Sequence, residues 1–173
     1  GSALSAALYV WNGGMESGNA VARVLSGKVN PSGRLPDTIA KRYNDYPSAK
    51  NFGGKKYNNY QEDIYVGYRF FETFDKTAVR YPFGFGLSYT TFEEKGALKK
   101  DEQGFFVDVS VKNTGDVPGK NVVAVYVSAP QGELGKPDKI LVGFHKTKEL
   151  ETGETEEFII RIPLENITSF DET

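Results

Sequence analysis

The chain has 173 residues, enough for one or two domains, and a formal net charge of −2 at pH 7. The near-neutral charge argues against a nucleic-acid partner, and no apolar run is long enough to span a membrane. The absence of cysteine excludes disulfides and thiolate metal sites, and the single histidine, His145, argues against a histidine metal centre or a Ser-His-Asp triad. We therefore expect no metal and no cofactor.

The first part of the chain predicts half of a β-α-β unit. Residues 6–11 form an apolar run that is typical of a buried strand in a parallel sheet. We expect Ser17 to cap a helix that ends near Leu25, with Gly27 at its carboxyl end. The glycines between residues 13 and 18 match neither a dinucleotide motif nor a P-loop, and Glu16 would repel a phosphate, so nucleotide binding is not favoured.

Residues 30–38 predict a turn followed by a rigid extended piece, because two prolines there fix the backbone. Arg34 within it is interpreted as a structural ion-pair partner in preference to a ligand contact. Residues 41–59 are polar and predict a long irregular loop. Its neighbouring tyrosines are expected to pack this loop onto the body of the protein, with a sugar site as the alternative; they are Tyr43, Tyr46, Tyr57 and Tyr60.

Residues 61–71 are interpreted as a strand with an adjacent acidic pair, Glu62 and Asp63. Neighbouring residues of a strand point to opposite faces, so this pair is not expected to act jointly as acid and base. Arg69 lies among aromatic residues, which suggests a stacked or ion-paired guanidinium.

Residues 81–92 have bulky side chains at the odd positions from Tyr81 to Tyr89 and small or turn-forming residues between them. A period of two would place the large side chains on one face and leave the other face as nearly bare backbone, open to close approach by another segment. We interpret this segment as a junction between two structural units. The alternative is an aromatic-rich core strand.

After residue 92 the pattern changes to short strands separated by turns, which favours a β-sandwich. The predicted strands are residues 91–98, 105–112, 121–128, 140–144 and 156–162, with turns at residues 113–116 and 151–154. Such a sandwich usually has about seven strands. We therefore expect an incomplete sandwich with open sheet edges, which favours homo-oligomerisation, strand exchange or poor solubility.

These motifs together resemble glycoside hydrolase family 3, across essentially the whole chain. Residues 1–88 resemble the carboxyl-terminal part of the family's α/β sandwich domain, and residues 89–173 resemble its fibronectin type III-like domain, here truncated. The matching residues are Trp11, 14–20, 24–27, 30–38, 60–69, 81–92, 107–115, 122–127 and 139–144. The implied fold class is α+β: a partial β-α-β segment followed by an immunoglobulin-like antiparallel β-sandwich.

The resemblance implies a fragment of a retaining β-glucosidase or related exo-β-glycosidase that hydrolyses terminal β-linked glucosyl residues of a β-glucoside or oligosaccharide. The family's nucleophilic Asp lies in a barrel domain, and its acid/base Glu lies well before the motif at residues 30–36. No catalytic residue is therefore assigned in this chain, which is expected to be inactive alone and to support the catalytic core. Tyr60 and Glu62, beside the long loop, are candidates for lining the substrate cleft.

Residues 37–40 and 62–65 look most like the family variant in which the barrel domain follows the fibronectin-like domain. The alternative function is a stand-alone carbohydrate- or protein-binding β-sandwich, which would display coplanar aromatic side chains on its surface. The absence of cysteine favours a cytoplasmic location, with secretion as the alternative.

Overall fold

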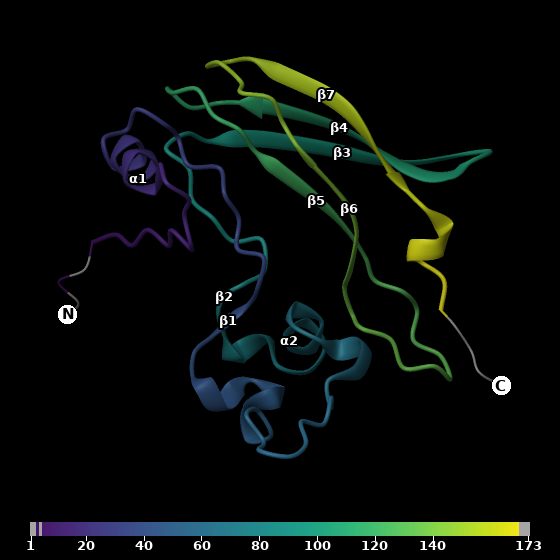
Figure 1. Ribbon diagram of the computed structural model, residues 1–173. Helices are drawn as coiled ribbons and strands as arrows, with labels where there is room; N and C mark the ends of the chain where they lie inside the picture. Colours follow the sequence, from purple (N-terminus) through teal and green to yellow (C-terminus); the bar gives the residue numbers. More distant parts are fainter. Residues whose placement is uncertain (1–2, 4, 170–173) are drawn as a thin grey trace.

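A computed structural model describes residue 3 and residues 5–169 of the chain. The outer ends of the two predicted domains, including residues 171–173, lie outside the described residues. Figure 1 shows two regions: a β-sandwich formed by the second half of the chain, and a set of short helices below and beside it formed by the first half. None of the described helices is long and apolar enough to cross a membrane.

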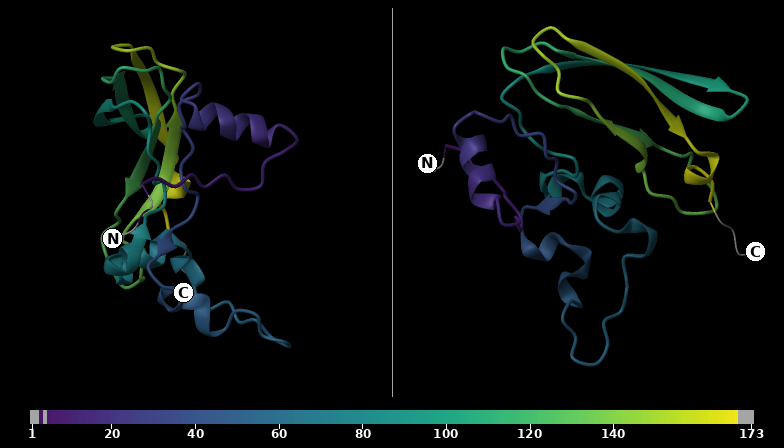
Figure 2. Two further views of the ribbon diagram at one scale, coloured as in Figure 1. Left: turned by 90° about the vertical axis from the view of Figure 1, so that its left-hand side faces the viewer. Right: turned by 45° about the horizontal axis from the view of Figure 1, so that its top comes forward.

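The first region contains two α-helices, α1 (Ser17–Leu25) and α2 (Tyr68–Phe74), and a short antiparallel pair of strands, β1 (Ile39–Ala40) and β2 (Val79–Tyr81). Four 3₁₀ turns connect them: η1 (Tyr43–Asp45), η2 (Pro47–Lys50), η3 (Asp63–Tyr65) and η4 (Lys76–Ala78). The small core of this region is formed by Ala40, Phe71 and Ala78. The loop between η2 and η3 projects away from the body, as both views of Figure 2 show.

The predicted strand at residues 6–11 is wrong, because these residues have no regular structure and are all exposed. A buried strand needs a hydrogen-bonding neighbour and covering layers, and no described segment pairs with this run. The helix after it is confirmed, but Ser17 is its first residue, and Glu16 takes the cap position without a side-chain cap. Gly27 follows the helix end with φ of 73°, as expected.

The interpretation of residues 61–71 as a strand is also wrong. They form η3 and the first turn of α2, with Asp63 at φ of 48° and Gly67 at φ of 62°. Positive φ angles interrupt an extended backbone, so period-two alternation cannot continue through them. The aromatic side chains at Tyr68, Phe71 and Phe74 are three residues apart, which suits a helix, and Phe71 is buried.

All five predicted sandwich strands are confirmed. They are β3 (Phe92–Asp101), β4 (Gly104–Asn113), β5 (Val122–Val127), β6 (Ile140–Lys146) and β7 (Thr155–Ile162), followed by the 3₁₀ turn η5 (Leu164–Asn166). They form two sheets in the orders β3-β4-β7 and β5-β6, with antiparallel pairing throughout. The two layers are visible in Figure 1. The architecture of few helices and several antiparallel sheets confirms the predicted fold class.

The sandwich core consists of Val109 and Val111 from β4, Ile160 from β7, and Leu150 from the β6–β7 connection. The β4 residues alternate between this core and the outer face, as the sequence pattern predicted. Asn113, at the end of β4, is completely buried, and its side chain forms hydrogen bonds with three connections: Thr90 before β3, Gly115 and Val117 after β4, and Leu150 after β6. The core thus lies between the sheets and ends at a buried polar group.

Candidate functional site

The junction predicted at residues 81–92 is built on close backbone contact with the extended piece at residues 30–38. The Leu35 amide donates to the Phe85 carbonyl at 2.8 Å, and the Gly84 amide donates to the Leu35 carbonyl at 2.7 Å. A Cβ atom added at Gly86 would lie 2.5 Å from the Gly33 carbonyl oxygen. The expected close approach to a bare backbone face is therefore confirmed.

The expectation that the bulky side chains of this segment share one face is wrong. The Phe85 amide donates to the Pro82 carbonyl at 3.1 Å, and Gly84 has φ of 79°, so a turn interrupts the extended chain. Phe83 consequently packs against Tyr68 of α2 with ring centroids 4.8 Å apart, whereas Phe85 packs back onto Tyr81 at 5.0 Å. The turn distributes the aromatic side chains between two contacts.

Arg34 joins the first region to the sandwich. One guanidinium nitrogen donates to the Gly86 carbonyl, and the other donates to Oδ1 of buried Asn121 at 2.7 Å. Asn121 in turn donates to the Glu94 carboxylate of β3 at 2.6 Å. The predicted structural role of Arg34 is confirmed, but its direct partners are neutral oxygens and not the carboxylate of an ion pair.

Asn30 makes a second connection between the regions. Its Oδ1 accepts hydrogen bonds from the Ser88 hydroxyl and the Tyr89 amide, both at 2.9 Å, and its amide nitrogen donates to the Pro118 carbonyl at 3.0 Å. The Tyr89 hydroxyl donates to the Val24 carbonyl of α1 at 2.9 Å. Asn30 thus holds residues 88–89 against the sandwich, and the Tyr89 side chain reaches α1.

Helix α2 forms a third connection, with the β5–β6 hairpin. The Leu141 amide donates to the Tyr68 hydroxyl at 2.7 Å, and Lys139 lies 3.5 Å from the Glu72 carboxylate and 4.5 Å from the ring centroid of Tyr126. Burial, with smaller contributions from Tyr68 and Glu72, raises the pKa of the Tyr126 phenol. The junction therefore consists of polar and aromatic contacts made by three segments: the stretch around Arg34, Asn30, and α2.

A small pocket of about 210 Å³ lies in the first region, beside α2. It is lined by Asp37, Tyr46, Pro47, Ser48, Glu62, Val66, Gly67 and Phe71. The structure brings Glu62 into this pocket but leaves Tyr60 outside its lining, with the Tyr60 hydroxyl donating to the Asp63 carbonyl at 2.8 Å. The two candidates therefore do not converge on this pocket, and their contact with substrate stays a prediction.

Only one of the four tyrosines expected to pack the long loop onto the body does so extensively. Tyr46 meets Phe71 edge-on at 5.8 Å, and its hydroxyl is hydrogen-bonded to the Thr38 carbonyl and the Ala40 amide. Tyr43, Tyr57 and Tyr60 are exposed, so the packing expectation is wrong for them. Tyr57 and Tyr60 lie on or beside the loop that projects from the body.

The expected stacking or ion pairing of Arg69 is not found among the described residues. Its guanidinium donates to the Ile64 carbonyl at 3.5 Å, because α2 places it next to the preceding 3₁₀ turn. The sequence interpretation also missed Asp37 and Ser48 as pocket residues. They lie in turn-rich stretches far from Glu62 in the chain, and no local pattern indicates that the three meet.

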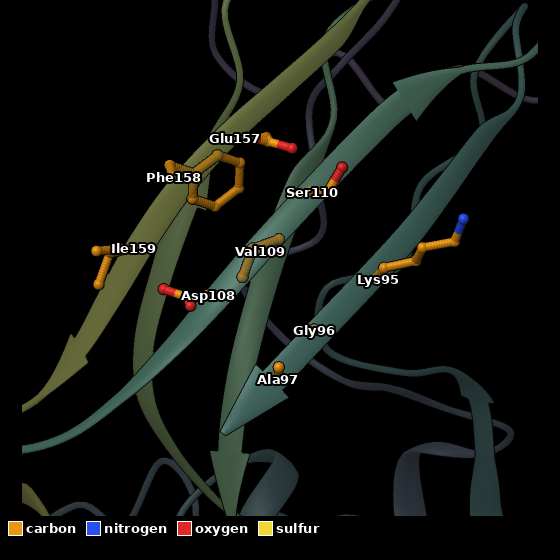
Figure 3. A pocket seen from close by; sticks show the side chains of 9 residues that line it. All are labelled: Lys95, Gly96, Ala97, Asp108, Val109, Ser110, Glu157, Phe158 and Ile159. Carbon is orange, nitrogen blue, oxygen red and sulfur yellow. The ribbon is translucent and has the colours of Figure 1, made fainter. Parts of the chain in front are cut away.

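A larger, shallow groove of about 740 Å³ follows the β3-β4-β7 sheet. Figure 3 shows Lys95 directed away from the other labelled side chains, with Val109 near the middle of the view and Phe158 above it and to the left. Phe158 is the only aromatic side chain in the lining, and it packs against the His145 ring at 4.0 Å. The described sandwich has no pair of exposed, stacked aromatic rings along this groove, which disfavours a stand-alone carbohydrate-binding module.

Comparison with known proteins agrees with this architecture. The family model for the Glycosyl hydrolase family 3 C-terminal domain matches residues 2–89, and the model for the Fibronectin type III-like domain matches residues 121–173. The chain therefore belongs to glycosyl hydrolase family 3. The resemblance seen in the sequence is confirmed, while the predicted domain boundary between residues 88 and 89 stays a prediction.

Relatives and solved structures extend the match. The chain is 49% identical to a beta-glucosidase of Ruminococcus albus, over 97% of this chain and 18% of that protein. It is 48% identical to Beta-glucosidase A of Butyrivibrio fibrisolvens, over 98% of this chain and 23% of that protein. A crystal structure of a beta-glucosidase from Paenibacillus barengoltzii matches with a TM-score of 0.90 and 50% identity, covering 94% of this chain and 18% of that one.

Beta-glucosidase 3B from Thermotoga neapolitana, solved in complex with glucose, matches with a TM-score of 0.87 and 44% identity. The match covers 94% of this chain and 23% of that one. The chain thus spans about a fifth of the length of the curated relatives it matches.

Proposed function

We propose that this chain is part of a β-glucosidase or related exo-β-glycosidase that removes terminal β-linked glucosyl residues from a β-glucoside or oligosaccharide. The main support is the match of almost the whole chain, at 49% and 48% identity, to two proteins named as beta-glucosidases. Retaining enzymes of this kind use two carboxyl groups, one as nucleophile and one as acid/base. We assign neither group to this chain, in keeping with the family resemblance.

The proposed role of this chain is to brace the catalytic core. Arg34, Asn30 and α2 each connect the first region to the sandwich, so the two regions form one supporting body. Leu8, Tyr9, Trp11 and Leu87 are exposed in the described chain, and we propose that such side chains contact the parts of the parent enzyme outside this chain, namely the rest of the α/β sandwich domain and the barrel domain. The position of that domain after the fibronectin-like domain stays a prediction, as does the lining of the substrate cleft by Tyr60 and Glu62.

Hydrolysis of p-nitrophenyl β-D-glucoside by the full-length protein and by this chain alone tests the proposal. We expect an active full-length protein and an inactive chain, because the two carboxyl groups would lie elsewhere. Activity of the purified chain would overturn the supporting role, and Glu16, Glu62 and Asp63 would then be the first residues to replace. An inactive full-length protein would contradict the proposed hydrolase activity.

We also propose a cytoplasmic location, for which the absence of cysteine is the support, and homo-oligomerisation through the open sheet edges. Cell fractionation tests the location. Sedimentation of this chain at increasing concentration tests the association, and a monodisperse monomer at high concentration would contradict it.

A further inference from the structure

The pocket beside Glu62 combines an aromatic floor with a polar rim. Phe71 is 1% exposed and supports the floor together with Tyr46. Asp37, Ser48 and Glu62 provide two carboxylates and a hydroxyl at the rim. A largely apolar lining with a few polar groups is the usual composition of a small-molecule site.

The rim groups retain free hydrogen-bonding capacity. One oxygen of the Asp37 carboxylate accepts a hydrogen bond from the Thr38 amide at 2.7 Å. Among the described residues, the side chains of Ser48 and Glu62 have no hydrogen-bond partner. The carboxylates can accept hydrogen bonds from ligand hydroxyl groups, and the Ser48 hydroxyl can both donate and accept.

The lining restricts the class of ligand. Two carboxylates without a basic residue in the pocket repel phosphates and other anions. No group of three or more metal-ligating side chains occurs in the part of the chain that the structure describes. A volume of about 210 Å³ is below the range of about 300–1,000 Å³ of drug-sized pockets, so the site has room for one ring and not for an oligosaccharide.

We propose that this pocket binds a single neutral sugar ring, with its hydroxyls on the Glu62 and Asp37 carboxylates and the Ser48 hydroxyl, and its C–H face toward Pro47 and Val66. The choice of a sugar among neutral polyols rests on the proposed β-glucosidase function. The backbone beside the pocket is set by Gly67, whose φ of 62° turns the chain from η3 into α2 and places Glu62 and Phe71 on the same cavity.

Hydrogen–deuterium exchange on the full-length protein, with and without D-glucose, tests this proposal because it localises binding to a segment. Glucose is expected to slow amide exchange in residues 46–71, and Glu62→Ala or Ser48→Ala is expected to weaken the effect at least severalfold. Glu102→Ala, in the exposed turn between β3 and β4, is the matched control and keeps the effect. Unchanged exchange in α2 and β2 of the first region and in β4 of the sandwich, without glucose, establishes that the variants fold.

Ionic strength separates a neutral ligand from a cation. Glucose protection is expected to persist between about 0.05 M and about 1 M salt, whereas an ammonium ligand held by two carboxylates would be lost. Protection by methylammonium and not by glucose would overturn the proposal, as would glucose protection that survives Glu62→Ala. Hydrolysis measured on the same protein keeps the outcomes apart: an active enzyme without protection overturns only the pocket, and an inactive one with protection overturns only the proposed function.

Discussion

The two regions of this chain differ in how much of their apolar surface the described chain covers. In the sandwich, both sheets are present, and Val111 and Leu150 are completely buried between them. In the first region, α1 has no buried residue, and the apolar run at residues 6–11 is exposed throughout. An apolar pattern therefore becomes a buried element only where its covering layer is also present.

The largest effect is expected at the one site where the first region has a well-covered core. Phe71→Ala removes a ring that is 1% exposed and is expected to lower the free energy of unfolding by about 3–5 kcal/mol, through lost burial and the cavity left behind. Urea unfolding measures this change in the free energy of unfolding. Phe52→Ala, at a ring that is 74% exposed, is the control, with an expected change within about 0.5 kcal/mol. Equal effects of the two variants would mean that the first region has no core of its own.

The matching test in the sandwich is Asn113, whose buried side chain accepts from the Thr90 hydroxyl and the Gly115 amide and donates to the Val117 and Leu150 carbonyls. Asn113→Ala leaves these groups without partners and is expected to cost about 2–4 kcal/mol in urea unfolding. Asn113→Asp keeps the acceptor but loses both donated bonds.

Asn58→Ala, in the exposed loop, is the control for both Asn113 variants and should change little. A near-neutral Asn113→Ala would show that the end of the sandwich core does not depend on this polar group.

The strands of the sandwich could be predicted from the sequence because their signal is local. Val107, Val109 and Val111 alternate with polar residues, and the face that they mark is buried in the same chain. Residues 6–11 have an equally apolar pattern, but no described strand pairs with them. Residues 61–71 misled the prediction because positive φ angles at Asp63 and Gly67, which the residue types permit but do not require, turn the chain into a helix.

The junction and the pocket were predictable to different extents. Small residues at Gly84 and Gly86 signalled close backbone contact, and this was confirmed. The partners of Arg34 could not be predicted, because Asn121 is 87 residues away and only the folded arrangement brings them together. Glu62 was a candidate from its place beside the loop, but its meeting with Asp37 and Ser48 depends on three segments and on no shared motif.

Arg34→Ala tests whether the two regions behave as one body. The guanidinium bonds to Gly86 and Asn121 are half-buried, and their loss is expected to cost about 2 kcal/mol. Weaker coupling should also separate thermal unfolding into two transitions, read by calorimetry. Arg34→Lys is not expected to restore the junction, because a single ammonium cannot reproduce the fork of donors. A single unchanged transition in Arg34→Ala would assign the coupling to α2 and Asn30.

The smallest expected effect comes from an exposed ion pair on the sandwich. The Lys148 ammonium donates to Glu154 at 2.6 Å, and this hydrogen bond, followed by that from the Glu151 amide, lowers the pKa of the Glu154 carboxyl from its ordinary value of 4.5. A depressed carboxyl pKa stabilises the folded state above pH 4.5, and this contribution is lost as the pH falls through the folded-state value. The urea midpoints of the wild type and Glu154→Gln should therefore differ slightly above pH 4.5 and converge in acid. Repeating the titration in a Lys148→Ala background should reduce the difference between the two midpoints, because Lys148 is the main partner of Glu154. A difference between the midpoints that grows in acid would contradict a lowered Glu154 pKa in the folded state.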